Sequence, residues 1–329
     1  MHIRTWLEMP YLDDTFPLPL DHPFTTQAAI AAGIPRKWLP ALVESGLLRN
    51  PIRGCLVPAQ VVDDTASRIA CLRLVTPPDA VLVDRHAGWA QGANMLLLPN
   101  EHLNAQPISL YLPHGRGRLR NKLADSGERT LLERDVIDMD GLRMTTPLRT
   151  ALDLGRQRWP EPALTALDAL HRLRAFSIAE LLDEIGRFAG MRWVTTLREV
   201  APHTDGRSQS GGETVVRWRW RHLPVPLPEP QVEVRSGTKV AFVDVGNDDL
   251  RFGVEFQGRE WHIGEVNEAN DAERFDWLDK EADWEIAPVW TPDVYGRNAP
   301  LEDIILDGVT RSRARAGRRT SGTQAPTRS

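Results

Sequence analysis

Acidic and amide side chains occur at strand-like positions in the last third of the sequence. Asp244 lies near the end of the apolar segment 239–245, while Glu255 and Gln257 occupy alternating positions on the next such segment. Side chains two residues apart on a strand point to one face, and a carboxylate in an apolar strand is costly unless it binds something. Such oxygen ligands hold Mg²⁺ or Mn²⁺, which shields phosphate charge and lowers the pKa of a bound water. We therefore expect Asp244, Glu255 and Gln257 to be metal ligands and catalytic residues in phosphodiester hydrolysis.

Further candidates flank these three residues. Glu213, in the first turn of the preceding helix, supplies either a third carboxylate or the second half of a capping box with Ser210. His262 is expected to be a catalytic base or a phosphate partner, or else a structural histidine. Asp271 and Arg274 share one face of the following helix, where Arg274 either holds a DNA phosphate bidentately or forms a surface ion pair.

The elements that must position these residues follow the order αβββαβα. Ser210 and Glu213 mark the start of a helix that runs to about residue 222. The hairpin signal Ser236-Gly237-Thr238 joins the first two strands. The expected elements after that helix are strands at 231–235, 239–245 and 251–256, a helix at 265–282, a strand at 285–290 and a helix at 301–312.

The segment 208–310 resembles an uncharacterised bacterial domain family related to the very-short-patch-repair endonuclease, within the PD-(D/E)XK nuclease superfold. The matching text is Glu229-Pro-Gln-Val-Glu-Val, Val243-Asp244, Gly253-Val-Glu-Phe-Gln-Gly258, Trp261-His262 and Asp271-Ala-Glu-Arg274, with Leu278 and Trp284. The resemblance implies a restriction-endonuclease-like αβββαβ domain. It also implies that Asp244 is the central metal-binding aspartate, Gln257 the second ligand, His262 the active-site histidine and Glu213 the helix glutamate.

The sequence departs from this family at Gln257, where members usually carry aspartate. A neutral amide oxygen weakens a divalent-cation site, although Glu255 lies two residues away. The usual lysine after the second acid is also absent. Two functions therefore stay open: a metal-dependent DNA endonuclease, or a catalytically inactive domain that binds DNA or a protein partner.

The N-terminal residues 1–58 have the order of a winged helix-turn-helix. Helix signals at 27–32 and from 34 onward precede a basic hairpin at 48–57. Pro40 indicates that the second helix kinks or begins there. The basic residues expected to meet DNA phosphates lie at the start of the second helix and in the hairpin: Arg36, Lys37, Arg49 and Arg53. Winged helices also dock proteins, so this alternative stays open.

The N-terminal text also resembles the abortive-infection type IV antitoxins (AbiEi-like), on Phe24-Thr-Thr-Gln-Ala-Ala-Ile-Ala-Ala-Gly33 and Leu47-Leu-Arg with Arg53-Gly54. Two later segments, Ala80–Ala90 and Gly141–Leu154, are similar to text that joins the two domains in many actinobacterial proteins. The resemblance implies an antitoxin-like transcriptional regulator that represses its own operon, with a toxin encoded nearby as partner.

The overall composition indicates the class of protein and how its charge is distributed. The chain has 329 residues, of which 41% are hydrophobic and 26% charged, as in ordinary globular proteins of two or three domains. It lacks an 18-residue apolar run or a signal peptide, and its two cysteines favour a reducing cytoplasm. Residues 241–310 carry 18 acidic against 5 basic residues, whereas the tail from Arg311 carries six arginines and no acid. This acidity counts against tight DNA contact through that segment.

We expect an α/β chain, α+β overall, in four parts: a winged helix-turn-helix at 1–58, a mixed α/β region at 59–207, the endonuclease-like domain at 208–312 and a basic disordered tail at 313–329. The polar segment 203–212 is expected to be a linker, and residues 1–23 to be irregular. Five tryptophans are expected in the core: Trp218, Trp220, Trp277, Trp284 and Trp290.

Overall fold

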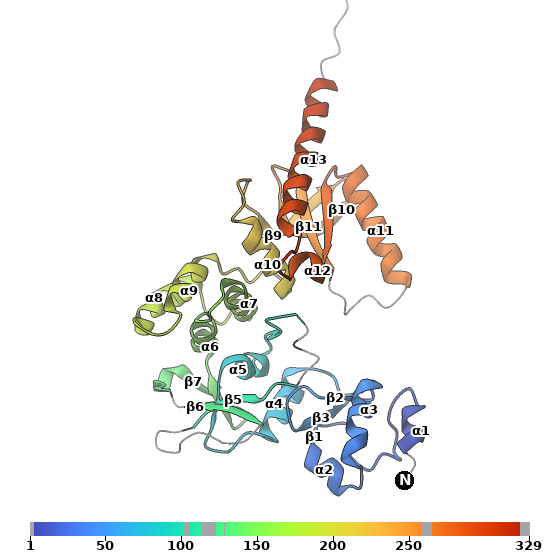
Figure 1. The fold of residues 1–329 in the computed structure, drawn as a ribbon, viewed down its shortest axis with the longest axis vertical. Coiled ribbons are helices and arrows are strands. Elements are labelled where there is room, and N and C mark those ends of the chain that lie inside the picture. Colours follow the sequence, from blue (N-terminus) through green and yellow to red (C-terminus); the bar gives the residue numbers. More distant parts are fainter. Residues whose placement is uncertain are drawn as a thin grey trace, which may run out of the picture. The chain divides into compact units, whose positions relative to one another are not determined.

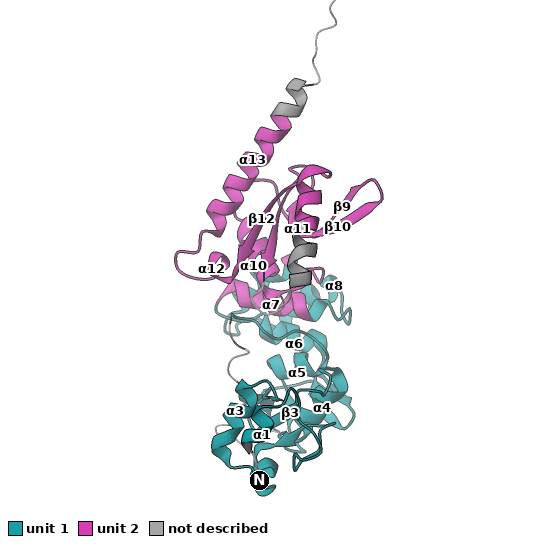
Figure 2. Ribbon diagram, turned by 90° about the vertical axis from the view of Figure 1, so that its right-hand side faces the viewer, with its two compact units in different colours: residues 1–158, 170–202 teal, residues 159–169, 203–329 magenta. Residues whose placement is uncertain are grey.

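The computed structural model has a mixed α/β fold with three β-sheets in its described part (Figure 1). It divides into two compact units, shown in Figure 2 and described one by one below. Unit 1 comprises residues 1–158 and 170–202, and unit 2 comprises residues 159–169 and 203–329. The structure describes the backbone of residues 3–99, 101, 105–112, 123–127, 129–257 and 265–322, and for residue 3 and the segments 265–272 and 318–322 the backbone alone. The expected α+β class is confirmed, whereas the four-part division stays a prediction.

Unit 1 begins with short helices and a three-stranded antiparallel sheet of order β1-β3-β2. Thr25 caps the second helix by accepting the N–H of Ala28 at 3.0 Å, and Gly33, with φ of +90°, lets the chain leave it. Pro40 lies in the first turn of the next helix, so that helix begins there and has no kink. The elements are α1 Ile3–Leu7, β1 Phe24–Thr25, α2 Thr26–Ala31, η1 Arg36–Trp38, α3 Leu39–Glu44, β2 Leu48–Arg49 and β3 Cys55–Pro58.

Residues 8–23 form no helix or strand, as the sequence predicts, whereas α1 occupies Ile3–Leu7. Trp6, Leu12 and Phe16 are buried in one cluster with residues of α2 and α3. The indole N–H of Trp6 donates to Thr15 Oγ1 at 2.9 Å. Because large apolar side chains leave water here, this proline-rich segment packs against the helices although its backbone is irregular.

The rest of unit 1 surrounds a five-stranded mixed sheet of order β6-β5-β4-β8-β7. Asp140 and Gly141, both with positive φ, form the tight turn between its last two strands. The strands are β4 Val81–Leu82, β5 Ile108–Tyr111, β6 Ala124–Gly127, β7 Val136–Met139 and β8 Leu142–Thr145. The helices are α4 Thr65–Arg73, α5 Asp84–Ala90, α6 Pro147–Leu154, α8 Ile178–Glu184 and α9 Val194–Val200.

Unit 2 is a four-stranded sheet with helices on both faces, in the order β12-β11-β10-β9 (Figure 1). Its strands are antiparallel except for the parallel pair β11 and β12, which α11 connects. Helices α10 and α13 bury one face, and Trp277 and Leu278 of α11 pack on the other. The elements are α7 Pro160–His171, α10 Gly211–Trp220, β9 Glu229–Ser236, β10 Lys239–Asn247, β11 Phe252–Gln257, α11 Glu265–Lys280, β12 Glu285–Trp290, α12 Thr291–Val294 and α13 Leu301–Gly322.

Strand β10 changes faces at its centre. Val243 packs in the core beneath α11, while Val245, two residues later, packs in the core beneath α10 and α13. Simple alternation would put both side chains on one face. Opposite this point, Gln231 of β9 has a φ of +53°, a left-handed conformation that side-chain-bearing residues rarely adopt. The distortion falls at Asp244, the residue between the two valines.

The segment 203–212 is not a loose linker. Asp205 donates its N–H to Asp168 of α7 at 2.8 Å, and Thr214 and Arg217 of α10 bind the same carboxylate at 2.8 and 2.6 Å. Burial raises the pKa of Asp168 to about 6, against the lowering effect of Arg217, so the carboxylate is ionised at neutral pH. The polar composition thus serves a buried network that fixes α10 to α7.

Helix α13 continues to Gly322, through ten residues of the expected disordered tail. Arg315 explains part of this order, because its guanidinium binds Asp279 at 2.5 Å and Glu285 at 2.8 Å. Residues 323–329 lie outside the described residues.

Four of the five tryptophans are buried as expected, but Trp290 is 49% exposed. It ends β12, beyond the packed centre of the sheet. Within the described part of the chain, none of the helices is both long and apolar enough to cross a membrane.

Candidate functional site

Side chains from four elements of unit 2 meet around the distorted part of β10. Glu213 lies in α10, Asp244 in β10, Glu255 in β11 and Arg274 in α11. We call these four residues, together with Gln231, the acidic cluster. The three acids are those that the sequence singled out as catalytic candidates, and the charges of Glu255 and Glu213 both act on Asp244.

Glu213 is buried and takes part in one half of the expected capping box, while its role as a third catalytic carboxylate stays a prediction. Its backbone N–H donates to Ser210 Oγ at 3.2 Å, which caps α10. Its carboxylate accepts the N–H of Gln209 at 2.7 Å, one residue before the cap residue. The positive end of the helix dipole further favours an acid in this first turn. Capping thereby fixes the Glu213 carboxylate at the edge of the acidic cluster.

Gln231 joins two of the acids, and the sequence did not predict this residue. Its Nε2 donates to Glu213 Oε2 at 3.1 Å and to Asp244 Oδ1 at 3.3 Å, while its Oε1 accepts Gln209 Nε2 at 3.0 Å. The left-handed backbone of Gln231 accompanies this position. Uncommon backbone conformations cost about 1–3 kcal/mol and concentrate at functional sites. A sequence pattern gives no sign of such a φ angle outside glycine.

Glu255 is held by a two-pronged contact with Arg274. Arg274 Nη1 donates to Glu255 Oε1 at 3.1 Å and Nη2 to Oε2 at 2.8 Å. The Glu255 side chain is 4% exposed and that of Arg274 is 30% exposed. Parallel guanidinium–carboxylate contacts are among the stronger hydrogen bonds in proteins. Arg274 is therefore paired with an acid of the cluster, and its predicted contact with DNA stays a prediction.

Asp244 has a strongly raised pKa because of its surroundings in the acidic cluster. Burial, and then the nearby charges of Glu255 and Glu213, raise its pKa to about 8, although the N–H of Phe256 at 3.0 Å and the charge of Arg274 act in the opposite direction. The cluster holds three carboxylates and one guanidinium, so its members together carry an excess of negative charge when all of them are ionised. A bound cation, or a proton on one of the acids, would reduce the repulsion among the three carboxylates.

Gln257 ends β11 on the same strand face as Glu255 and is half-buried. The parallel register of β11 and β12 sets it beside the exposed Trp290. Trp261 and His262 lie outside the described residues, as does the side chain of Asp271. The predicted roles of His262 and Asp271 stay predictions.

A divalent metal fits this cluster in charge and atom type, because Mg²⁺ prefers oxygen ligands and its positive charge would offset the excess of acids. The present contacts are less suitable. Both oxygens of Glu255 accept from Arg274, and the amide of Gln231 lies between Glu213 and Asp244. Among the described residues, no three histidine, cysteine, aspartate or glutamate side chains form a metal-holding group. Binding would require Glu255 or Gln231 to change partners.

The predicted DNA-contacting residues of unit 1 fall into two pairs. Arg36 and Lys37 are exposed in η1, directly before α3. Arg49 instead donates to the carbonyl of Val61, and Arg53 Nε donates to the carbonyl of Ala105 at 3.0 Å. The first pair presents its charge to solvent, whereas the second pair also fastens the hairpin to the chain around it.

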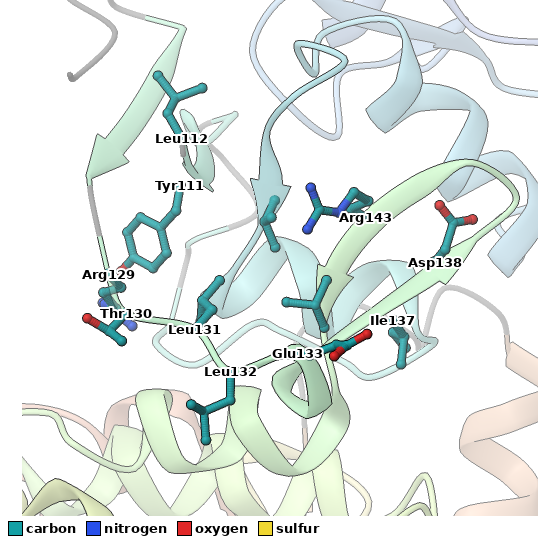
Figure 3. Close-up of a pocket in the computed structure, with 12 residues that line it drawn as sticks. Tyr111, Leu112, Arg129, Thr130, Leu131, Leu132, Glu133, Ile137, Asp138 and Arg143 are labelled. Carbon is teal, nitrogen blue, oxygen red and sulfur yellow. The ribbon is translucent and has the colours of Figure 1, made fainter. Parts of the chain in front are cut away.

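Unit 1 also contains a cavity of about 830 Å³ on one face of its five-stranded sheet (Figure 3). Tyr111 and Arg129 line one end, and Asp138 and Arg143 the other. The guanidinium of Arg129 stacks on the Tyr111 ring at 4.4 Å and binds the buried Asp153 at 2.9 Å. Its charge is thus paired with a buried carboxylate of the same unit.

His86, in the same unit, is a structural histidine. Its Nδ1 accepts the N–H of Ser109 at 3.0 Å, and burial lowers its pKa to about 3.

Comparison with known proteins adds relatives but no assigned function. No family model matches the chain. Two curated proteins, Uncharacterized protein MT2308 of Mycobacterium tuberculosis strain CDC 1551 / Oshkosh and Uncharacterized protein Rv2248 of strain ATCC 25618 / H37Rv, are 31% identical to it over 176 residues. The match covers 53% of this chain and 65% of each relative, so the chain spans less than two thirds of their length.

One solved structure is also similar in part, the crystal structure of RV2827C protein from Mycobacterium tuberculosis. The likeness covers 70% of this chain and 82% of that chain, with 16% sequence identity and a TM-score of 0.28. A likeness this weak does not indicate a function.

Proposed function

We propose that this chain is a DNA-associated protein whose unit 2 hydrolyses phosphodiesters with a divalent metal, Mg²⁺ or Mn²⁺. The observation that supports this function is the excess negative charge of the acidic cluster. Burial and two neighbouring acids raise the pKa of Asp244 to about 8. Titratable groups with strongly shifted pKa values are concentrated at functional sites, and a cation would relieve this crowding.

Asp244 would hold the metal, with Glu255 and Gln257 as further oxygen ligands. When bound, the metal would shield phosphate charge and lower the pKa of a water molecule. The negative charge of Glu213 would favour a cation nearby, and its carboxylate would orient Gln231, from which it accepts a hydrogen bond at 3.1 Å. His262 is the candidate for moving a proton, on the sequence resemblance alone.

DNA contact is proposed for the winged helix-turn-helix of residues 1–58. The order helix, turn, helix, antiparallel hairpin supports this assignment. Arg36 and Lys37 carry exposed positive charge at the start of the second helix, where such modules meet the phosphate backbone.

A second candidate function follows from the contacts of Glu255. Because Arg274 already neutralises this acid, the alternative proposal is that the nuclease-like domain is a non-catalytic binding module. The chain would then be an antitoxin-like transcriptional regulator, with a toxin encoded nearby as its partner. This function needs DNA binding but no metal.

A metal titration separates the two functions. Under the first function, Mg²⁺ or Mn²⁺ raises the melting temperature of the wild-type chain, because a ligand that binds only the folded state stabilises it. Asp244→Ala removes that rise, whereas Asp249→Ala, which changes an exposed acid of the next turn, keeps it. Loss of metal-dependent cleavage of a plasmid in Asp244→Ala then tests the hydrolysis itself. A wild-type chain whose melting temperature does not respond to either metal excludes the first function.

DNA binding is tested separately with a labelled duplex and fluorescence anisotropy. Arg36→Ala with Lys37→Ala should weaken binding and reduce its salt dependence, since each lost phosphate contact lowers the salt slope by about one. Unchanged affinity would remove residues 1–58 as the DNA-binding module.

A further inference from the structure

The contact between Arg274 and Glu255 occupies the place where a cation would act. Both oxygens of Glu255 accept from the guanidinium, at 3.1 and 2.8 Å, and the carboxylate is almost fully buried. A carboxylate bound in this way has its charge already matched. A metal that uses Glu255 must therefore compete with Arg274 for the same oxygens.

Arg274 has contacts that define one closed position. Its Nη1 also lies 3.3 Å from the carbonyl oxygen of Phe242 in β10, and its guanidinium stacks on the ring of Phe275 at 5.0 Å. The side chain thus links α11 to two neighbouring strands. It is 30% exposed, which leaves it a route toward solvent.

We propose that Arg274 is a positioning residue that holds Glu255 in a closed resting state and must release it before a divalent cation can bind. The inference depends on the proposed metal-dependent function. In the closed state the guanidinium offsets part of the negative charge of the acidic cluster. In the open state the metal supplies it, and Arg274 can change partner.

Nucleic acid would favour the same open state. A phosphate offers the guanidinium the same two-oxygen geometry as a carboxylate, so a bound backbone gives Arg274 an alternative partner. Cation and nucleic acid then each raise the affinity for the other, because such coupling is reciprocal. Metal therefore binds the DNA-bound protein more tightly than it binds the free protein.

The test measures Mn²⁺ affinity by electron paramagnetic resonance of the free ion, with and without a DNA duplex. Without DNA, Arg274→Met should bind Mn²⁺ about tenfold more tightly than wild type, a change equal in size but opposite in direction to the smaller losses seen when a residue that supports a metal ligand is removed. Arg274→Lys, which keeps the charge but has no fork, should also bind more tightly than wild type. Arg311→Met serves as the matched control, because it removes an arginine–glutamate pair of the same unit.

A double-mutant cycle with Glu255→Gln separates competition from simple charge removal. If Arg274 competes for the oxygens of Glu255, the gain from Arg274→Met disappears in the Glu255→Gln background. A gain that persists there, or wild-type affinity in Arg274→Lys, would overturn the proposal. DNA should raise the Mn²⁺ affinity of wild type and have a much smaller effect in Arg274→Met.

Failure of the proposed function has a different outcome. If neither wild type nor Arg274→Met binds Mn²⁺ in any condition, both the metal-dependent function and the closed state are excluded. If wild type binds Mn²⁺ through Asp244 with the same affinity as Arg274→Met, the metal site stands and the closed state is wrong. Thermal unfolding of each variant verifies that the fold is retained.

Discussion

Replacing Asp244 by asparagine should stabilise the metal-free protein at high pH. The pKa of this acid is raised from 3.8 to about 8 in the folded state. Between these two values the folded state keeps a proton that the unfolded chain releases. The contribution of Asp244 to the free energy of unfolding is therefore fully present below the unfolded pKa and is lost as the pH rises toward 8. An asparagine side chain does not ionise, so the Asp244→Asn variant escapes this loss.

The expected size follows from the rise in pKa. At about 1.4 kcal/mol for each pKa unit, a rise from 3.8 to about 8 sets an upper limit of about 6 kcal/mol. Asp244 is half-buried, so screening by water reduces this limit. We expect about 2 kcal/mol at about pH 8.5, or about 5 °C in the transition of unit 2.

The assay is denaturant unfolding in the presence of a chelator, at about pH 5 and about pH 8.5, on either side of the folded pKa. The stability advantage of Asp244→Asn over wild type should be larger at the higher pH. Asp249→Asn, at an exposed turn, should show no such dependence. If Asp244→Asn is less stable than wild type at the higher pH, or if the wild-type stability does not fall between the two pH values, the charge crowding inferred for the acidic cluster is wrong.

Three other changes test separate features. Asp168→Asn should lower the free energy of unfolding by about 3 kcal/mol, because it leaves the guanidinium of Arg217 buried without a matching charge; denaturant unfolding would show a smaller loss if that pair is unimportant. Gly212→Ala should destabilise unit 2 by about 2 kcal/mol, since its new Cβ would lie 2.3 Å from the ring of Phe256. Gly317→Ala, in an exposed part of a helix, should instead raise the free energy of unfolding by about 0.5–1 kcal/mol. Equal melting temperatures of these two variants would contradict this reasoning. Arg36→Ala should leave the melting temperature unchanged while weakening DNA binding, so a large loss of stability would mean that its side chain has a packing role.

Local patterns in the sequence were sufficient for the elements that carry the acidic cluster. The apolar alternation before Asp244 and around Glu255 predicts β10 and β11, and the Ser210 cap predicts the start of α10. These signals depend on residues a few positions apart, so no tertiary knowledge was needed. The convergence of Glu213, Asp244 and Glu255 also agrees with the sequence-based choice of candidates, while their roles stay proposals.

The partners within the cluster were beyond the sequence. Glu255 and Arg274 are 19 residues apart, and only the packing of α11 on the sheet brings them together. Gln231 needs a left-handed backbone that its residue type does not indicate. The order of segment 203–212 depends on Asp168, which lies 37 residues before Asp205 on another helix. In each case a distant partner outweighs the local composition.

Because β10 changes faces at Asp244, the amide hydrogen exchange of its outer half should respond to a ligand in the acidic cluster. Beyond Asp244 toward the turn, β9 and β10 form a hairpin that projects from the sheet, while the inner half belongs to the main core (Figure 2). The junction between them is the Gln231–Asp244 contact. A ligand that stiffens this contact will slow amide hydrogen exchange throughout the hairpin, far from any atom it touches. Exchange rates at the hairpin would therefore register occupancy of the acidic cluster even when no reaction takes place.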